Sequence, residues 1–182
     1  MLHCSVISLD NLKPLKMSKN KPRKTILLSG GFDPIHIGHV RMILAAAEVG
    51  DVIIVANSDN WLMRKKQYVF MPGEERAKFL GAINGVATVA SVDDTDGTVC
   101  EALRRLKPDI FGNGGDRTNK NTPEMDVCKE LGIEMMWALG GKKIQSSSDL
   151  VKDSNLVDTS ESNDEELQPS KRILLRGKDC EN

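Results

Sequence analysis

The sequence has no long hydrophobic run, few cysteines, few aromatic residues and almost no net charge. No apolar stretch approaches the roughly 20 residues of a membrane-spanning helix, so a membrane span is not expected. The N-terminal stretch is interrupted by His3, Asp10 and Asn11, so it lacks the apolar core of a secretory signal. We therefore expect a cytoplasmic protein.

Four cysteines are spread over 182 residues without a Cys-x-x-Cys pair. This spacing indicates a reduced, intracellular chain and argues against a disulfide framework or a cysteine-rich zinc site. Aromatic residues make up only 4 %, and the middle of the chain is acidic. We therefore expect no nucleic-acid binding by that part of the protein.

The formal net charge of -1 conceals an uneven distribution of 25 basic and 26 acidic residues. Residues 1–24 carry six basic residues against one acidic, whereas residues 152–182 carry five basic residues against eight acidic. We therefore divide the chain into a basic flexible N-terminal segment (1–24), a folded domain (25–151) and an acidic flexible tail (152–182).

Within the folded domain, short apolar runs alternate with segments of helical period. Val40, Ile43, Leu44 and Ala47 fall on one helical face, and Gly50 follows as a stop signal. The runs predict strands at residues 25–29, 52–56, 86–92, 109–111 and 133–139. The pattern is typical of an α/β fold, a single doubly wound, Rossmann-like five-stranded parallel sheet with helices on both faces. Ligands of such sheets bind at the carboxyl ends of the strands, so we expect the chemistry in the loops that follow them.

Local signals refine this outline. We interpret residues 64–66 as a basic loop, and Thr98 with Glu101 as a capping box. Residues 112–116 predict a glycine-bearing turn, and Thr122-Pro123 predicts the start of a helix that ends at Gly132. The serines at 146–148 precede a final short helix.

The densest motif is Gly30-Gly31-Phe32-Asp33-Pro34-Ile35-His36-Ile37-Gly38-His39, which follows the first strand and opens the first helix. Imidazoles at this position can donate hydrogen bonds to phosphate oxygens, and the helix N-terminus adds a partial positive charge. Gly30 and Gly31 allow the turn, and Gly38 keeps bulk away from the two rings. The alternative is a pair of surface or capping histidines, or half of a metal site.

This motif resembles the signature of the cytidylyltransferase-like nucleotidyltransferases, which include glycerol-3-phosphate and phosphoethanolamine cytidylyltransferases and heptose-phosphate adenylyltransferases. The resemblance runs from about Thr25 to Val151. Its further parts are Ala56-Asn57-Ser58-Asp59, Arg64-Lys65-Lys66, Arg76, the Gly-Gly-Asp turn ending at Asp116, and Gln145-Ser146-Ser147-Ser148.

The resemblance implies nucleotidyl transfer, in which an acceptor phosphate attacks the α-phosphorus of a nucleoside triphosphate and pyrophosphate leaves. It implies that His36 and His39, with Lys65 or Lys66, act catalytically on the phosphates. The remaining motif positions would bind the nucleotide: Gly30, Gly31, Phe32, Asp33, Gly38, Arg76, Asn113, Gly115, Asp116, Ser146, Ser147 and Ser148. Mg²⁺ would arrive with the triphosphate, held largely by substrate and water and not by a protein cage.

Each implied role has a structural alternative. Residues 64–66 can be a solvated basic loop, and Arg76 can pair with Glu74 or Glu75. The turn at 114–116 can be conformational, and the serines can be a helix cap. Asn113 stands where some sugar-phosphate adenylyltransferases have lysine. Some relatives have an arginine a few residues before the serine motif, where this chain has Lys142 and Lys143. The sequence therefore does not identify the nucleobase or the acceptor.

The leading hypothesis is a nucleotidyltransferase that joins CMP or AMP, from CTP or ATP, to a small phosphorylated sugar or alcohol. The alternatives are an adenylyltransferase acting on nicotinamide or flavin mononucleotide, and a non-catalytic nucleotide-binding module. The resemblance also implies a homodimer.

Overall fold

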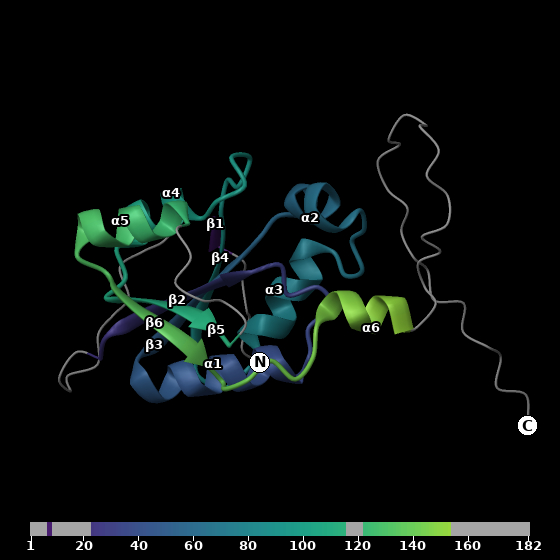
Figure 1. Ribbon diagram of the computed structural model, residues 1–182, viewed down its shortest axis with the longest axis horizontal. Coiled ribbons are helices and arrows are strands. Elements are labelled where there is room, and N and C mark those ends of the chain that lie inside the picture. The colour runs from purple at the N-terminus through teal and green to yellow at the C-terminus, as the bar shows by residue number, and fades with distance from the viewer. Residues whose placement is uncertain (1–6, 9–22, 116–121, 154–182) are drawn as a thin grey trace, which may run out of the picture.

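The computed structural model describes residues 7–8, 23–115 and 122–153. The expected flexible tail from residue 154 onward, most of the expected N-terminal segment, and Asp116 lie outside these residues. Each described strand is parallel to its neighbours, and the helices lie on both faces of the sheet (Figure 1). The doubly wound α/β fold expected from the sequence is thereby confirmed.

Five strands match the predicted ones. They are β2 (Thr25–Gly30), β3 (Asp51–Ala56), β4 (Val86–Ser91), β5 (Ile110–Gly114) and β6 (Glu134–Leu139). Their order across the sheet is β4-β3-β2-β5-β6. The chain therefore adds strands in one direction from β2 and then in the other, and the direction changes between β2 and β5.

A short sixth strand, β1 (Ile7–Ser8), extends the sheet beyond β4, where its residues pair with Ala90 and Ser91. The sequence assigned these two residues to the flexible N-terminal segment. Two residues are too few to show an alternating pattern, so periodicity gives no signal for them. The edge of β4 offers free backbone groups that a short extended segment can pair with.

Two apolar layers hold the helices to the sheet. On one face, α1 (Ile37–Val49) and α3 (Gly73–Gly81) pack through Ile43 and Leu80 on a core that includes Ile26 and Ile54. On the other face, α4 (Cys100–Leu106) and α5 (Pro123–Leu131) pack on a core that includes Leu27. Adjacent residues of β2 thus serve opposite faces, as the two-residue period of a strand requires.

Three local predictions are corrected. Residues 64–66 are not a loop but the last turn of α2 (Asp59–Lys66), which Ser58 caps by accepting a hydrogen bond from the Trp61 N–H at 3.0 Å. No capping box forms at Thr98, because α4 begins one residue later than that box needs and its N-cap is Val99. Much of the expected glycine turn belongs to a strand, since Gly112, Asn113 and Gly114 lie in β5.

The final short helix is α6 (Ser147–Asp153). Among the described residues, every helix is too short or too polar to cross a bilayer. Two cysteines, Cys100 and Cys128, are described; both are buried and free.

Candidate active site

A pocket of about 300 Å³ opens at the change of direction between β2 and β5. Its walls come from the start of α1, the end of β5 and the segment that joins β6 to α6. Four cationic side chains line it, Arg41, Lys66, Lys142 and Lys143, and the described lining residues include no carboxylate. A pocket of this charge, at the place where doubly wound folds bind ligands, suits a polyanion.

His36 and His39 stand together at the pocket wall. Their rings are stacked, with centroids 3.8 Å apart and planes inclined by 21°. Nδ1 of His36 accepts a hydrogen bond from the Gly38 N–H at 3.1 Å, and Nδ1 of His39 accepts one from the His36 N–H at 3.3 Å. The two histidines thus form a reciprocal cap on the first turn of α1.

The reciprocal cap determines the tautomer of both rings. Because each Nδ1 is an acceptor, a neutral ring carries its proton on Nε2. Burial lowers the pKa of His36, and the nearby charges of Lys66 and Lys143 lower it further. Near neutral pH, His36 is therefore an uncharged donor through Nε2–H.

Two residues keep the histidine rings in place. A Cβ on Gly38 would lie 2.9 Å from Cε1 of His36, so the ring can lie over the helix start only because residue 38 is glycine. Phe32 is buried and contacts His39 edge-on, with ring centroids 4.9 Å apart. The left-handed backbone conformation of this turn is at Phe32, with φ 50°, and not at either of its two glycines, Gly30 and Gly31.

The structure distinguishes two neighbouring lysines. Lys66 lines the pocket and its Nζ donates a hydrogen bond to the Asp33 carbonyl at 2.9 Å, whereas Lys65 is exposed and does not line the pocket. Burial lowers the pKa of Lys66, partly offset by the charge of Asp33. Of the two candidates from the sequence, Lys66 is the one in position to touch a ligand there.

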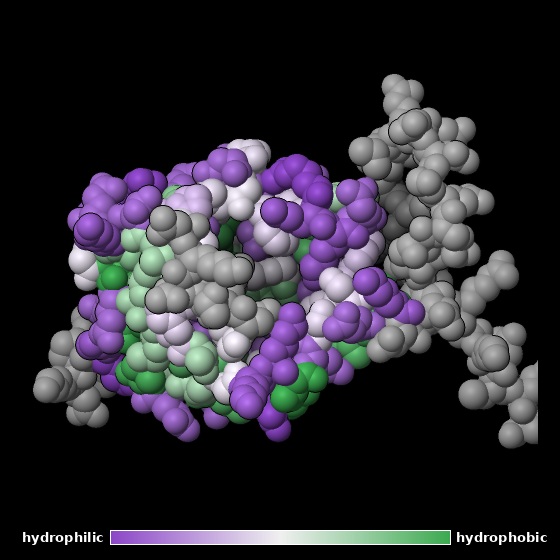
Figure 2. All heavy atoms as spheres, in the orientation of Figure 1, coloured by the Kyte–Doolittle hydropathy of each residue, from purple (hydrophilic) through white to green (hydrophobic). Residues whose placement is uncertain are grey.

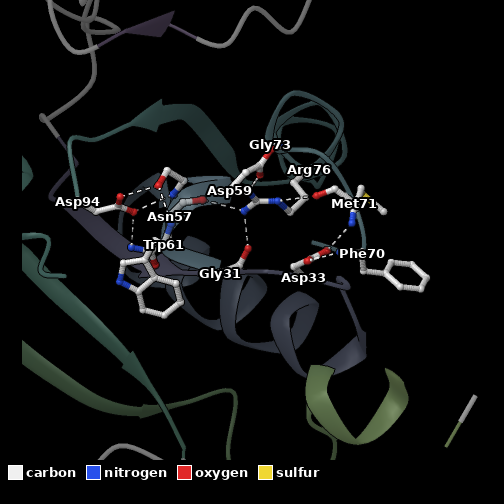
Figure 3. Close-up of polar contacts among 11 residues, drawn as sticks. Gly31, Asp33, Asn57, Asp59, Trp61, Phe70, Met71, Gly73, Arg76 and Asp94 are labelled. Atoms are coloured by element: carbon white, nitrogen blue, oxygen red, sulfur yellow. Dashed lines mark hydrogen bonds and ion pairs between the residues drawn. The ribbon is translucent and has the colours of Figure 1, made fainter. Parts of the chain in front are cut away.

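Asp33 is fully buried and supports the site from behind. Its two carboxylate oxygens accept hydrogen bonds from the Phe70 and Met71 N–H groups, each at 2.7 Å (Figure 3). Burial raises its pKa, and these two bonds oppose that rise. Asp33 does not line the pocket; through these two bonds it holds the connection from α2 to α3.

Arg76 is fully buried and also lies outside the pocket. Its guanidinium donates to the carbonyls of Met71, Gly31 and Asn57 at 3.0, 2.6 and 2.9 Å, and pairs with Asp59 at 2.5 Å (Figure 3). Its partner is Asp59, and neither Glu74 nor Glu75 is bonded to it among the described contacts. Arg76 therefore does not line this pocket, and the contact with phosphates that the family resemblance implies for it stays a prediction.

A second buried carboxylate fixes the start of α2. Asp94 accepts hydrogen bonds from Asn57 Nδ2 at 3.1 Å, from the Ser58 N–H at 2.8 Å and from the Ser58 hydroxyl at 2.6 Å. Arg64, in the last turn of α2, donates to the Asp94 carbonyl at 2.7 Å. Both ends of the helix that carries Lys66 are thus tied to one residue after β4.

The opposite wall depends on a close backbone approach. A Cβ on Gly115 would lie 1.9 Å from the Gly141 carbonyl oxygen, so only glycine lets the end of β5 touch the segment after β6. Asn113 lies beside this contact but does not line the pocket; it is buried, and its Nδ2 has no hydrogen-bond partner among the described residues.

The three serines behave differently from one another. All three line the pocket. The Ser147 hydroxyl donates to the Pro34 carbonyl at 2.9 Å and is largely buried, whereas the Ser146 hydroxyl accepts a bond from the Asp149 N–H at 3.4 Å. The start of α6, which begins at Ser147, is thereby attached to the loop that carries His36.

Not every candidate from the sequence reaches the pocket. Those that line it are His36, Gly38, His39, Lys66, Gly115, Ser146, Ser147 and Ser148; those that do not are Gly30, Gly31, Phe32, Asp33, Lys65, Arg76 and Asn113. Sequence reasoning missed Arg41, although it follows Gly38 by three residues and so shares its face of α1.

A family model described as cytidylyltransferase-like matches residues 27–162. The chain is similar to Bifunctional protein HldE of Gluconobacter oxydans, with 38% identity over 112 residues, 60% of this chain and 23% of the relative. It is also similar to FAD synthase of Thermococcus kodakarensis, with 35% identity over 104 residues, 56% of this chain and 68% of the relative. The chain thus spans about a quarter of that HldE relative.

Among solved structures, the lipopolysaccharide core biosynthesis protein from Thermoplasma volcanium GSS1 has a similar fold. The TM-score is 0.53 at 20% sequence identity, over 63% of this chain and 93% of that one. At this identity the likeness bears on the fold alone.

Proposed function

Because the chain belongs to the cytidylyltransferase-like nucleotidyltransferase family, we propose that it transfers CMP or AMP from a nucleoside triphosphate to a small phosphorylated sugar or alcohol. A phosphate oxygen of the acceptor attacks the α-phosphorus, the bond from that phosphorus to the bridging oxygen breaks, and pyrophosphate leaves with the electron pair. The observation that carries the proposal is the stacked pair His36–His39 at the wall of a cation-lined pocket.

The chain's residues supply positioning and charge, which dominate phosphoryl and nucleotidyl transfer. Nε2–H of His36 and of His39 would donate to phosphate oxygens where negative charge develops, and Lys66 would neutralise part of the charge that leaves. His36 suits this role, because its lowered pKa leaves it uncharged near neutral pH with its proton on Nε2, from which it can donate. Ser146 and Ser148 offer hydroxyls on the same wall.

Mg²⁺ enters as part of the substrate. The described residues hold no group of three or more His, Cys, Asp or Glu suited to a metal ion, and the described lining residues include no carboxylate. We expect the triphosphate oxygens and water to hold the ion, which suits its reluctance to dehydrate. When bound, Mg²⁺ neutralises phosphate charge.

A second candidate function is adenylyl transfer to flavin mononucleotide. The similarity to FAD synthase favours it, since FAD contains an AMP half. This chain also covers 68% of that relative, compared with 23% of the HldE relative. The chemistry and the residues would be the same, and only the acceptor would differ.

The test is pyrophosphate release in Mg²⁺, with each of the four nucleoside triphosphates against a panel of sugar phosphates, polyol phosphates, nicotinamide mononucleotide and flavin mononucleotide. We expect release for at least one pair. Binding of a triphosphate without release across the whole panel would instead favour a non-catalytic nucleotide-binding module. Size-exclusion chromatography with light scattering tests the homodimer that the family resemblance implies.

A further inference from the structure

The pocket has two ends that differ in chemistry. One end lies at the start of α1, where His36, His39 and Lys66 gather. The other end lies against the next turn of α1, where a Cβ on Gly140 would stand 2.7 Å from the Met42 nitrogen and 3.0 Å from the Arg41 carbonyl carbon. Gly141 touches Gly115 at this same end. Bare peptide planes therefore form much of this second wall.

The polar end accounts for the phosphates, so the second end is where the nucleoside would lie. A nucleobase in a pocket needs a flat partner, which proteins usually supply with an aromatic ring. Yet no Phe, Tyr or Trp of the described residues lines the pocket. The two imidazoles are not free for this purpose, because they stack on each other and His39 also contacts Phe32.

Arg41 has the chemistry and the position to replace that ring. A guanidinium is planar and stacks on aromatic faces, which an ammonium group does not do. Arg41 follows Gly38 by three residues, so its Cα lies about 4.5 Å further along the helix from the phosphate end. Its side chain is exposed at the pocket, and among the described residues it makes no hydrogen bond or ion pair. Nothing described therefore holds it away from a ligand.

We propose that Arg41 contacts the nucleobase, with its guanidinium lying across one face of the base and the Gly140–Gly141 peptide planes near the other. The proposal rests on the proposed function, since it assigns a part of the same nucleotide site. It makes Arg41 a determinant of nucleotide affinity that acts on the base and not on the phosphates.

The test compares two ligands that share phosphates but not a base. Dissociation constants are measured calorimetrically in Mg²⁺ for the preferred nucleoside triphosphate and for inorganic tripolyphosphate, with the full chain and with Arg41→Lys. The lysine keeps the charge and the helix but loses the plane. We expect the nucleotide to bind roughly tenfold more weakly to Arg41→Lys, and tripolyphosphate to bind as before. Arg41→Ala should weaken the nucleotide at least as much.

Arg104→Lys is the matched control, because Arg104 lies on α4 and pairs with Glu130 away from the pocket. Equal weakening of nucleotide and tripolyphosphate by Arg41→Ala would make Arg41 a phosphate ligand and overturn the proposal. Unchanged nucleotide binding in both Arg41 variants would overturn it as well. If none of the four nucleoside triphosphates binds the unsubstituted protein, the proposed function fails first and the inference with it.

Discussion

At the scale of single residues, the guanidinium of Arg76 joins segments of the chain that lie far apart in sequence. It bonds the carbonyls that follow β2 and β3, the first residue of α2 and the connection before α3. Three of its partners are backbone carbonyls that would otherwise lack this donor, and the fourth is the half-exposed carboxylate of Asp59. Arg76 therefore holds together the loops that support the pocket.

Arg76→Lys should lower the free energy of unfolding by about 2 to 4 kcal/mol, because a lysine cannot satisfy four acceptors in a planar fork and leaves buried oxygens unpaired. Urea denaturation followed by circular dichroism measures the loss. The exposed pair Arg104–Glu130 provides a control, and Arg104→Lys should cost less than about 0.5 kcal/mol. Weaker nucleotide binding by Arg76→Lys with unchanged stability would contradict the structural role.

The protonation of His36 makes the stability of the folded protein depend on pH. Its pKa in the folded protein lies below the ordinary value of 6.5, so at intermediate pH the unfolded chain binds a proton that the folded protein does not. The resulting stabilisation is fully present above pH 6.5 and is lost as the pH falls toward the pKa of the folded protein. We therefore expect the free energy of unfolding to fall below pH 6.5, and His36→Gln to reduce that slope. Denaturation series from pH 7.5 to 5 compare the two proteins; identical slopes would argue against the shift.

At the scale of elements, the orientation of α2 determines which of its basic residues faces the pocket. Successive residues of a helix are rotated by about 100°, so Lys65 and Lys66 cannot point the same way. Ser58 caps the helix, and Asp94 ties down both of its ends. Hydrophilic side chains gather over α2 on the face shown in Figure 2, as expected for a short helix with a polar outer side.

Lys66→Ala should lower kcat by about a hundredfold, because it removes a cation near the leaving phosphates, whereas Lys65→Ala should change kcat less than threefold. Steady-state pyrophosphate release measures both. The two variants lose the same charge from the same helix, so their difference isolates position. Equal losses would mean that the orientation of α2 is not what selects the lysine.

The sequence predicts the strands and the long helices because their periodicity extends over many residues. It also locates the histidine motif, since two histidines and several glycines in ten residues are a dense signal. It does not separate Lys65 from Lys66, because α2 is only eight residues long and reads as a basic loop. Ser58-Asp59 at its start and Arg64-Lys65-Lys66 at its end are the cap and charge signals that would have indicated it.

Other parts of the site depend on distances that sequence patterns do not contain. The carbonyl partners of Arg76 come from three loops, and no regular spacing in the sequence predicts that these loops meet. The contact between Gly115 and Gly141 joins the ends of two strands and is visible only once the register of β5 and β6 is known. Arg41 was missed because charged residues on an exposed helix face are ordinary, and only the pocket makes this one informative.

At the scale of the whole molecule, the described fold and the family match end at different places. The described helix α6 ends at Asp153, and the family match continues to residue 162. The N-terminal side differs too, because Ile7 and Ser8 pair with β4 whereas the match begins at residue 27. Truncation at either end of the chain therefore tests the predicted bounds of the domain, residues 25–151.

Removal of residues 156–182 should leave the melting temperature within about 2 °C and pyrophosphate release largely intact. Removal of residues 1–20 should leave release largely intact but lower the melting temperature by a few degrees, because it deletes β1, and about 1 kcal/mol moves a domain of this size by roughly 3 to 6 °C. A chain ending at residue 162 is the control. If only that longer chain is active, residues 156–162 belong to the working domain.

The reciprocal cap of His36 and His39 ties chemistry to architecture in a way that constrains how this site can change. Each imidazole uses its Nδ1 to cap the start of α1 and also lines the pocket, so most substitutions damage the helix and the reaction together. Asparagine is an exception at position 36, since its Oδ1 stands where Nδ1 stands and can cap the helix without an Nε2–H. Few substitutions at position 36 would therefore let a related protein keep the fold and lose the reaction. Asn-Ile-Gly-His in place of His-Ile-Gly-His would identify such a protein.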